Sequence, residues 1–395
     1  MDFIAIILPA IVAFFATSWV YPYILKVSKV KNIVDNPNAR KLQRVPVPIL
    51  GGLSVSFGGL CGIMSFSSFG GFNDMLPIFA AMIVIMFIGF IDDIIGLSPK
   101  IRFIIEILLV VYLITATGNQ INNFHGLWNI ELIDNFISLP LTVFACVGII
   151  NAINLIDGVD GYSSGYCIMA CAFFGVMFYM IGDFRMVALA LIVIAALIPF
   201  FLHNVFGKRT KMFIGDSGTL SLGIIMSIFV CNILTDSTDV SATSPTLGLI
   251  PFTLATMSVP IFDTLRVMSL RILRGKSPFQ PDKTHLHHLF IELGFSHIGT
   301  TLMILSLNSL VILGWFISYK LGASIDVQLY GVIAFSTLIT FVFYRFMRIQ
   351  IANDSVIYKA FRRLGEFSNL ENYSIWPTMQ RYVDKTTEIN IENLD

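Results

Sequence analysis

The chain contains a run of residues, from Met75 to Ile91, that carries no charged side chain and then ends in the pair Asp92 and Asp93. An α-helix rises 1.5 Å per residue, so about 20 apolar residues cross the hydrocarbon core of a bilayer. Similar runs recur along the chain, which is 56% hydrophobic and only 13% charged, against about 25% charged residues in soluble domains. With a mean hydropathy of +0.80, the sequence predicts an all-α polytopic integral membrane protein.

Eleven apolar runs are long enough to be membrane-spanning helices. They are residues 3–25, 49–68, 76–95, 101–118, 136–152, 163–182, 186–203, 217–234, 246–265, 300–319 and 328–347. Polar or helix-breaking residues interrupt two of them. Asn151 and Asn154 fall at the end of the fifth run, and Pro251 and Pro260 fall within the ninth.

Lysine and arginine residues lie almost entirely in alternate loops between these runs. All but two of the 25 basic residues, Arg185 and Lys320, fall on one side, which the positive-inside rule assigns to the cytoplasm. This places the N-terminus outside and the C-terminus in the cytoplasm. The sequence therefore predicts a multi-span domain over residues 1–347 and a polar cytoplasmic tail over residues 348–395, with one short helix near residues 355–364.

The clusters of acidic residues, histidines and glycines all fall in loops of the predicted cytoplasmic side. These clusters are Phe90-Ile-Asp-Asp93, Asn151-Ala-Ile-Asn-Leu-Ile-Asp-Gly-Val-Asp-Gly161, Lys211-Met-Phe-Ile-Gly-Asp-Ser-Gly218 and Ser277-Pro-Phe-Gln-Pro-Asp-Lys-Thr-His-Leu-His-His288. Loop residues without a shared role would not all fall on one side of the membrane. We therefore expect the four clusters to line one cytoplasmic cavity.

The acidic and amide residues of these clusters suit a divalent cation. Asn154, Asp157 and Asp160 are spaced three residues apart, which keeps their oxygens near one face of a helical turn. Asp216 stands at the start of an apolar helix, where a carboxylate is also a good cap. Oxygen ligands of this kind favour Mg²⁺ or Mn²⁺, and Mg²⁺ commonly combines one or two carboxylates with substrate phosphates. The side chains available for phosphate are Lys100, Arg102, Lys208, Arg209, Lys211, His285, His287 and His288.

Each cluster also has a simpler structural interpretation. The aspartate pair could end a membrane helix, the glycine-rich segment could be a capped turn, and Asp216 could be only a helix cap. The histidine triplet could bind zinc, but no cysteine lies in the predicted cytoplasmic loops to complete a common structural zinc site. Glu106, four residues after Arg102, is expected to pair with it. A transporter is the alternative from another class, but transporters place ionisable residues near the membrane midplane, where this chain has almost none.

Taken together, the four motifs resemble those of the polyprenyl-phosphate N-acetylhexosamine-1-phosphate transferases, in order, over residues 1–347. The chain is most similar to the WecA/TagO branch. The MraY branch has His-His-His-Phe-Glu, whereas here Leu286 interrupts the histidines and Ile291 follows Phe290. The resemblance implies transfer of N-acetylglucosamine 1-phosphate from UDP-GlcNAc to undecaprenyl phosphate, the first membrane step of cell-envelope glycan synthesis. Donors that stay open are UDP-FucNAc, UDP-QuiNAc and UDP-MurNAc-pentapeptide.

The resemblance also implies a Mg²⁺-dependent phosphotransferase of the inner (plasma) membrane, with its active site facing the cytoplasm. Mn²⁺ is an alternative metal, the bilayer and the two substrates are the expected partners, no nucleic acid is expected, and a homodimer is compatible with the resemblance. The expected catalytic residues are Asp92, Asp93, Asp157, Asp160, Asp216, His285, His287 and His288. The expected substrate-binding residues are Arg44, Lys100, Arg102, Asn154, Leu155, Gly158, Phe213 and Asp282. The expected metal ligands are Asp216, Asn154, Asp92 and Asp93.

Within this set, Phe213 would stack on uracil, and Leu155, Gly158 and Asp160 would line the uridine pocket with Asp157 supporting them. The histidines would contact donor phosphates or sugar. A phosphate monoester has a second pKa of about 6, so the lipid phosphate is mostly dianionic near pH 7 and hardly needs a general base. We therefore expect Asp92 and Asp93 to place the metal and to orient Lys100 or Arg102 toward the lipid phosphate.

Overall fold

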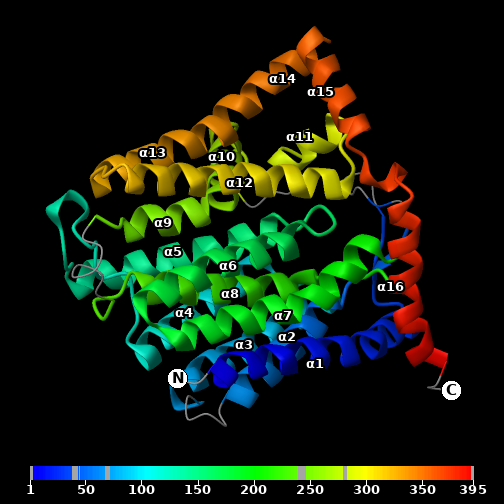
Figure 1. Ribbon diagram of the computed structural model, residues 1–395, viewed down its shortest axis with the longest axis horizontal. Coiled ribbons are helices and arrows are strands. Elements are labelled where there is room, and N and C mark those ends of the chain that lie inside the picture. The colour runs from blue at the N-terminus through cyan, green and yellow to red at the C-terminus, as the bar shows by residue number, and fades with distance from the viewer. Residues whose placement is uncertain are drawn as a thin grey trace.

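The computed structural model describes residues 3–37, 43, 45–66, 72–238, 246–278 and 283–392, which form a bundle of helices lying side by side (Figure 1). The longer helices are α1 Phe3–Val30, α2 Gly51–Phe66, α3 Phe72–Ile95, α4 Pro99–Thr117, α5 Asn135–Leu155, α6 Tyr162–Ile181, α7 Phe184–Phe206, α8 Gly215–Ile233, α10 Ser258–Leu273, α12 His297–Lys320, α13 Ile325–Thr337, α15 Val356–Phe367 and α16 Ile375–Glu392. The shorter elements are β1 Val34–Asp35, β2 Val47–Pro48, η2 Leu127–Asn129, α9 Leu249–Thr256, α11 Leu286–Glu292, η3 Leu338–Phe343, α14 Tyr344–Ala352 and η4 Leu370–Asn372.

Eight helices among the described residues are long and apolar enough to cross a membrane. They cover Ile4–Val30, Met75–Ile95, Asn135–Leu155, Tyr162–Ile181, Phe184–Phe206, Gly215–Ile233, His297–Lys320 and Ile325–Ala352. The predicted all-α multi-pass membrane fold is therefore confirmed, whereas the full count of eleven spans and their orientation stay predictions. Of the other three expected spans, α2 is apolar but shorter, and α4 carries charged residues in its first two turns.

The third of these, expected over residues 246–265, is divided into α9 and α10. Pro260 has no N–H, so it cannot pair with the carbonyl of Thr256 in the preceding turn. That carbonyl instead accepts hydrogen bonds from Asn308 Nδ2 at 3.1 Å and Tyr166 Oη at 2.7 Å. Oδ1 of Asn308 in turn accepts the N–H of Val259 at 3.0 Å. The break is thus stabilised by α6 and α12, and α10 then continues as far as Leu273.

Helix α8 lies at the centre of the bundle, and almost all of its residues are buried against α2, α3, α5 and α6. Glycines permit the closest approaches. A Cβ on Gly89 of α3 would lie 2.5 Å from the Cα of Ser217, and a Cβ on Gly218 would lie 2.7 Å from the Cα of Gly52 on α2. The first turn of α8 is therefore pressed against α2 and against the end of α3 that carries Asp92 and Asp93.

The segment between α1 and α2 is tied to the segment that precedes α8. Strands β1 and β2 pair antiparallel, with Val34 opposite Pro48. The carbonyl of Pro48 accepts the N–H of Phe213 at 2.7 Å, and the N–H of Gly51 donates to the carbonyl of Phe213 at 2.9 Å. These bonds fix the position of Phe213 beside β2.

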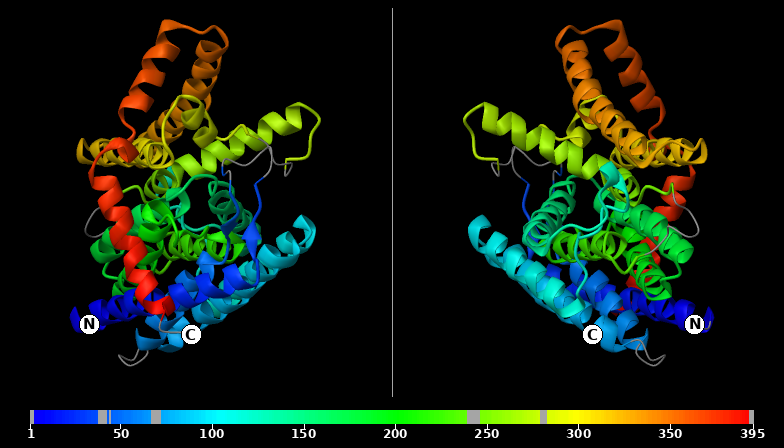
Figure 2. Two further views of the ribbon diagram at one scale, coloured as in Figure 1. Left: turned by 90° about the vertical axis from the view of Figure 1, so that its right-hand side faces the viewer. Right: turned by 90° about the vertical axis from the view of Figure 1, so that its left-hand side faces the viewer.

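The C-terminal part of the chain crosses one end of the bundle. Helices α13 and α14 are joined by a π-helical segment, so one continuous helix runs to Ala352. It continues past residue 347, the predicted end of the multi-span domain. The short helix expected near residues 355–364 corresponds to α15. Helix α16 was not predicted, and it lies across the ends of α1 and α7 (Figures 1 and 2).

Candidate active site

A cavity of about 950 Å³ opens at the end of the bundle where α3, α5, α7 and α8 meet their loops. Its size is at the upper end of the range typical of small-molecule sites, about 300–1,000 Å³. The four sequence motifs all contribute to its wall. The predicted site residues that line it are Asp92, Asp93, Asn154, Asp157, Gly158, Asp160, Phe213, Asp216 and His288.

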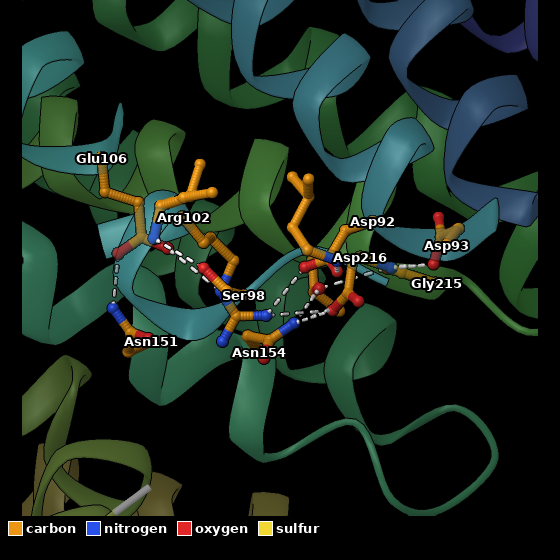
Figure 3. A network of polar contacts seen from close by, with 12 residues as sticks. Asp92, Asp93, Ser98, Arg102, Glu106, Asn151, Asn154, Gly215 and Asp216 are labelled. Atoms are coloured by element: carbon orange, nitrogen blue, oxygen red, sulfur yellow. Dashed lines mark hydrogen bonds and ion pairs between the residues drawn. The ribbon is translucent and has the colours of Figure 1, made fainter. Parts of the chain in front are cut away.

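Two carboxylates and an amide converge at one side of this cavity (Figure 3). Nδ2 of Asn154 donates to Oδ1 of Asp216 at 2.5 Å and to Oγ1 of Thr219 at 2.8 Å. Nη1 of Arg102 lies 3.2 Å from Oδ2 of Asp92 and 3.8 Å from Oδ1 of Asp216. Arg102 therefore bridges α3 and α8, and its charge faces both carboxylates.

Asp93 has a different environment from its neighbour. Its Oδ1 accepts the backbone N–H of Asp216 at 2.7 Å, and its Oδ2 accepts the N–H of Ser217 at 3.0 Å. Helix α8 has no side-chain cap of its own, because Ile214 stands at the N-cap position. A helix N-terminus leaves its first N–H groups unpaired, and Asp93 satisfies two of them from another helix. Both oxygens of Asp93 are thus engaged in holding the first turn of α8.

Arg102 is held in place by the buried carboxylate of Glu106. Glu106 is fully buried, and its Oε1 lies 3.6 Å from Nε of Arg102, so the predicted i,i+4 pair is confirmed. Its other oxygen accepts a hydrogen bond from Asn151 Nδ2 at 2.6 Å. A buried charge requires such partners. Glu106 thus fixes the guanidinium of Arg102 beside Asp92 and Asp216, two residues that line the cavity.

The Asp157 and Asp160 side chains lie in the turn between α5 and α6, and their surroundings shift their pKa values in opposite directions. Burial raises the pKa of Asp157 to about 7, with a hydroxyl hydrogen bond from Ser163 opposing the shift. Burial also acts to raise the pKa of Asp160, but His297 and Lys211 outweigh it and hold the pKa below its usual range. The distances to Oδ2 of Asp160 are 2.8 Å from Nδ1 of His297 and 2.5 Å from Nζ of Lys211. Asp160 is therefore a stable anion that orients Lys211 beside the Phe213 ring, 5.8 Å from its centroid.

The three histidines of the fourth motif have unequal access to the cavity. Only His288 of the three lines it, while His285 and His287 are buried. Nδ1 of His285 lies 2.9 Å from Oδ2 of Asp263, which also accepts the N–H of Leu286. Burial holds the pKa of His287 well below its usual value, so its ring is neutral. His285 and His287 therefore lie behind the residues that line the cavity, and they do not line it themselves.

The remaining predicted residues lie away from the cavity or outside the described ranges. Lys100 is exposed on the first turn of α4, and Leu155 is half-buried at the end of α5; neither lines the cavity. Arg44 and Asp282 fall outside the residues that the structure describes. The roles expected for these four residues stay predictions.

Sequence reasoning missed several side chains that build the site. Lys29, His297 and Glu371 line the cavity from α1, α12 and η4. Asp263 of α10 fixes residues 285–288, here called the histidine loop, through His285 and the N–H of Leu286. None of them belongs to one of the four motifs. An acidic residue such as Asp263 inside an apolar run could have been recognised, since an ionisable residue at such a place has a functional or structural partner by default.

The donor set at Asp92, Asn154 and Asp216 fits a hard divalent cation that also binds substrate phosphate. The two carboxylates already face one shared positive charge, that of Arg102, and the Asp216 side chain is about a third exposed (31%). Within the described part of the chain, no group of three or more His, Cys, Asp or Glu side chains is arranged to hold a metal. Mg²⁺ usually takes one or two carboxylates and completes its shell with water and phosphate oxygens, and Asp92 and Asp216 would supply two carboxylates from the cavity wall.

The comparisons with known proteins agree with the motifs. Residues 75–233 match the sequence family described as glycosyl transferase family 4. The chain is 30% identical over 365 residues to the probable undecaprenyl-phosphate N-acetylglucosaminyl 1-phosphate transferase of Bacillus subtilis (strain 168), over 92% of this chain and 96% of the relative. It is 32% identical over 282 residues to the undecaprenyl-phosphate alpha-N-acetylglucosaminyl 1-phosphate transferase of Escherichia coli O157:H7, over 69% of this chain and 72% of the relative.

The relative in Bacillus subtilis is matched over almost its whole length, and the match covers 92% of this chain. The family expected from the motifs is confirmed, and with it the class of a membrane transferase. The chain belongs to glycosyl transferase family 4, among the polyprenyl-phosphate N-acetylhexosamine-1-phosphate transferases.

Proposed function

We propose that this protein transfers N-acetylglucosamine 1-phosphate from UDP-GlcNAc to undecaprenyl phosphate, releasing UMP and forming an undecaprenyl diphosphate sugar. The named activity of the two relatives supports this reaction. The observation that carries it in this chain is the convergence of Asp92, Asn154, Asp216 and Arg102 at the side of a cavity that Lys208, Arg209 and Lys211 also line. That arrangement suits a reaction between two phosphate groups, which needs positioning and charge neutralisation more than covalent chemistry.

The cavity offers the donor a distinct set of contacts. Lys208, Arg209 and Lys211 bring positive charge to it, and Phe213 presents an aromatic ring beside β2. A diphosphate carries several negative charges that basic side chains attract, and a uracil ring stacks well on an aromatic face. We assign the part of the cavity between Phe213, Gly158 and the basic residues to the UDP group.

The acceptor enters from the bilayer, where its polyprenyl chain stays. Arg102 stands on α4 next to exposed apolar residues, among them Ile101 and Phe103, and its guanidinium reaches Asp92 and Asp216. It is therefore placed to receive a phosphate from the membrane side and hold it in line with the donor. The attacking oxygen of the dianionic lipid phosphate then forms the new P–O bond to the donor phosphorus, and UMP leaves.

Mg²⁺ bound by Asp216, Asn154 and Asp92 would supply charge neutralisation for the diphosphate. Asp93 fixes the first turn of α8, which carries Asp216. Glu106 fixes Arg102, whose guanidinium faces Asp92 and Asp216. The predicted side with the basic loops is the cytoplasm, where nucleotide sugars are available. We therefore propose that the reaction takes place at the cytoplasmic face of the plasma membrane.

The experiment that tests this proposal uses membranes containing the full-length protein and labelled undecaprenyl phosphate. A panel of UDP-sugars is added with and without Mg²⁺, and both the lipid-linked product and UMP are measured. We expect equal amounts of the two products with UDP-GlcNAc and Mg²⁺, and none after chelation. Product with UDP-FucNAc or UDP-QuiNAc alone would change the donor, and no lipid-linked product with any donor would contradict the proposal.

A further inference from the structure

We propose that the C-terminal helix α16 is part of the donor site, and that Asp384 is a positioning residue for the basic loop. The basic loop is here residues 207–213, between α7 and α8, and it contains Lys208, Arg209 and Lys211. The identity of the donor rests on the proposed function above. The contribution of α16 rests on contacts of this chain alone.

The carboxylate of Asp384 receives the N–H groups of three consecutive residues of the basic loop. Its Oδ1 accepts the N–H of Lys208 at 3.1 Å, of Arg209 at 3.2 Å and of Thr210 at 3.3 Å. The Thr210 hydroxyl donates to the same oxygen at 2.9 Å. Hydrogen bonds to an ionised acceptor are roughly twice as strong as neutral ones, so this side chain holds the N–H side of the loop backbone in place.

Other groups hold the opposite, carbonyl side of the basic loop. Nζ of Lys29 donates to the carbonyl of Arg209 at 2.7 Å, and the Tyr21 hydroxyl donates to the carbonyl of Thr210 at 2.7 Å. Nδ1 of His203 lies 3.0 Å from Oγ1 of Thr210, and because that hydroxyl donates to Asp384, it accepts from His203. Helices α1 and α7 thus bind one side of the loop and α16 binds the other.

The helix that carries Asp384 is itself docked on the bundle. The Trp376 ring packs on Phe206 at the end of α7, with ring centroids 4.8 Å apart, and Val383 is buried. Just before this helix, Glu371 of η4 reaches the wall of the cavity. The tail therefore has a defined place beside the site.

Two roles are open to a carboxylate in such a position, and the structure favours one. Successive backbone N–H groups can bind an anion, so Asp384 could occupy a place meant for donor phosphate. However, Asp384 does not line the cavity, whereas the side chains of the loop that it holds do. Asp384 consequently supports the loop from the side that faces away from the cavity, and its loss would let Lys208 and Arg209 move relative to the donor.

The test compares full-length Asp384→Ala and Asp384→Asn with the wild type in the transfer assay. We expect the KM for UDP-GlcNAc to rise about tenfold in Asp384→Ala, because several charge-assisted hydrogen bonds are lost. The amide oxygen in Asp384→Asn still accepts N–H groups, so the donor KM of this variant should lie between those of the wild type and Asp384→Ala. The kcat and the KM for undecaprenyl phosphate should stay within about twofold of the wild-type values. The variant weakens donor binding equally in the ground state and the transition state, and such a loss raises the donor KM without changing kcat.

Asp354→Ala is the matched control. Asp354 is also an acid of the tail, and it is exposed and paired with Lys359 at 2.7 Å, far in the chain from the basic loop. A second variant, Thr210→Val, removes one hydroxyl donor to Asp384 without removing the carboxylate. Its effect on the KM should be smaller, and it should largely disappear in the Asp384→Ala background, because neighbouring groups of one network are not additive.

An unchanged donor KM in both Asp384→Ala and Thr210→Val would overturn the inference. A lower KM would also overturn it, since it would show that Asp384 competes with donor phosphate. Direct binding of UDP-GlcNAc to the purified protein gives an independent readout, in which Asp384→Ala should bind about tenfold more weakly. A wild type that forms no lipid-linked sugar would contradict the proposed function, whereas equal donor binding by the wild type and the variant would contradict only the role of Asp384.

Discussion

The backbone N–H of Asp216 donates to the Asp93 carboxylate at 2.7 Å, which joins the end of α3 to the first turn of α8. This bond separates the tasks of two adjacent acids. Asp92 turns toward Arg102, while Asp93 holds the backbone from which the Asp216 side chain reaches the cavity. The pair ends a membrane helix, as the simpler interpretation of the sequence has it, but it also builds the site.

Replacing Asp93 should therefore affect both stability and activity. Asp93→Ala leaves two N–H groups of α8 without their acceptor, and we expect a loss of about 1–3 kcal/mol in stability together with a fall in kcat. Asp134→Ala is the matched control, because Asp134 caps α5 through the N–H of Phe136 outside the cavity-lining set. The control should lower the thermal unfolding midpoint without lowering kcat, and a similar kcat in both variants would refute the anchoring role of Asp93.

Gly158 has no room for a side chain. A Cβ there would overlap the His287 ring, with Cε1 at 2.8 Å, so Gly158→Ala must displace either the turn or the histidine loop. We expect transfer activity to fall by at least about tenfold, since small misplacements of reacting groups are costly. Gly148→Ala on α5 is the control, because its Cβ would meet nothing within 4 Å, and its activity should match that of the wild type.

Arg102 rather than Lys100 should recognise the lipid phosphate. Arg102 is fixed by Asp92 and Glu106, whereas Lys100 is exposed. We predict that Arg102→Lys raises the KM for undecaprenyl phosphate by about tenfold or more, since a lysine cannot reproduce the planar fork of the guanidinium. Steady-state kinetics with varied lipid phosphate would check this, and an equal or larger effect of Lys100→Ala would reverse the assignment.

The stability of the protein should depend on pH through Asp157. Its pKa is raised to about 7 in the folded protein, against about 3.9 in an unfolded chain, so the folded state binds the extra proton between these values. Stability from this group is therefore present at low pH and is lost as the pH rises through about 7. We expect Asp157→Asn to remove this fall in the thermal unfolding midpoint, which takes place between about pH 4 and about pH 7, measured in buffers of equal ionic strength. An identical pH profile in both proteins would show that Asp157 does not titrate there.

The sequence predicted the cavity better than it predicted the contacts within it. The charge distribution placed Asp92, Asn154, Asp160 and Asp216 on one side of the membrane, and the structure brings all four to one cavity. Local patterns of this kind follow from helix length and loop position. The pairing of Asp93 with α8 could not be predicted in this way, because it depends on the packing of Gly89 against α8.

The structure of the tail also depends on contacts that could not be predicted from the sequence. The short helix expected near residues 355–364 corresponds to α15, whereas α16 was not expected in this polar segment. The position of α16 depends on the packing of Trp376 on Phe206 and on the hydrogen bonds between Asp384 and the basic loop. Both contacts join residues that are far apart in the chain. The break between α9 and α10 could not be predicted either, because the hydrogen bonds that stabilise it come from Asn308 of α12.

The central claim is that Asp216 is the carboxylate around which phosphosugar transfer takes place. The most direct measurement is the rate of UMP release from UDP-GlcNAc in the presence of undecaprenyl phosphate and Mg²⁺, for the wild type, Asp216→Asn and the control Asp236→Asn beyond the far end of α8. We predict a loss of at least about a hundredfold in Asp216→Asn, a size typical for removing a preorganised charge from a reacting centre, and wild-type rates in the control. Activity of Asp216→Asn close to that of the wild type, in protein with an unchanged unfolding midpoint, would contradict the account.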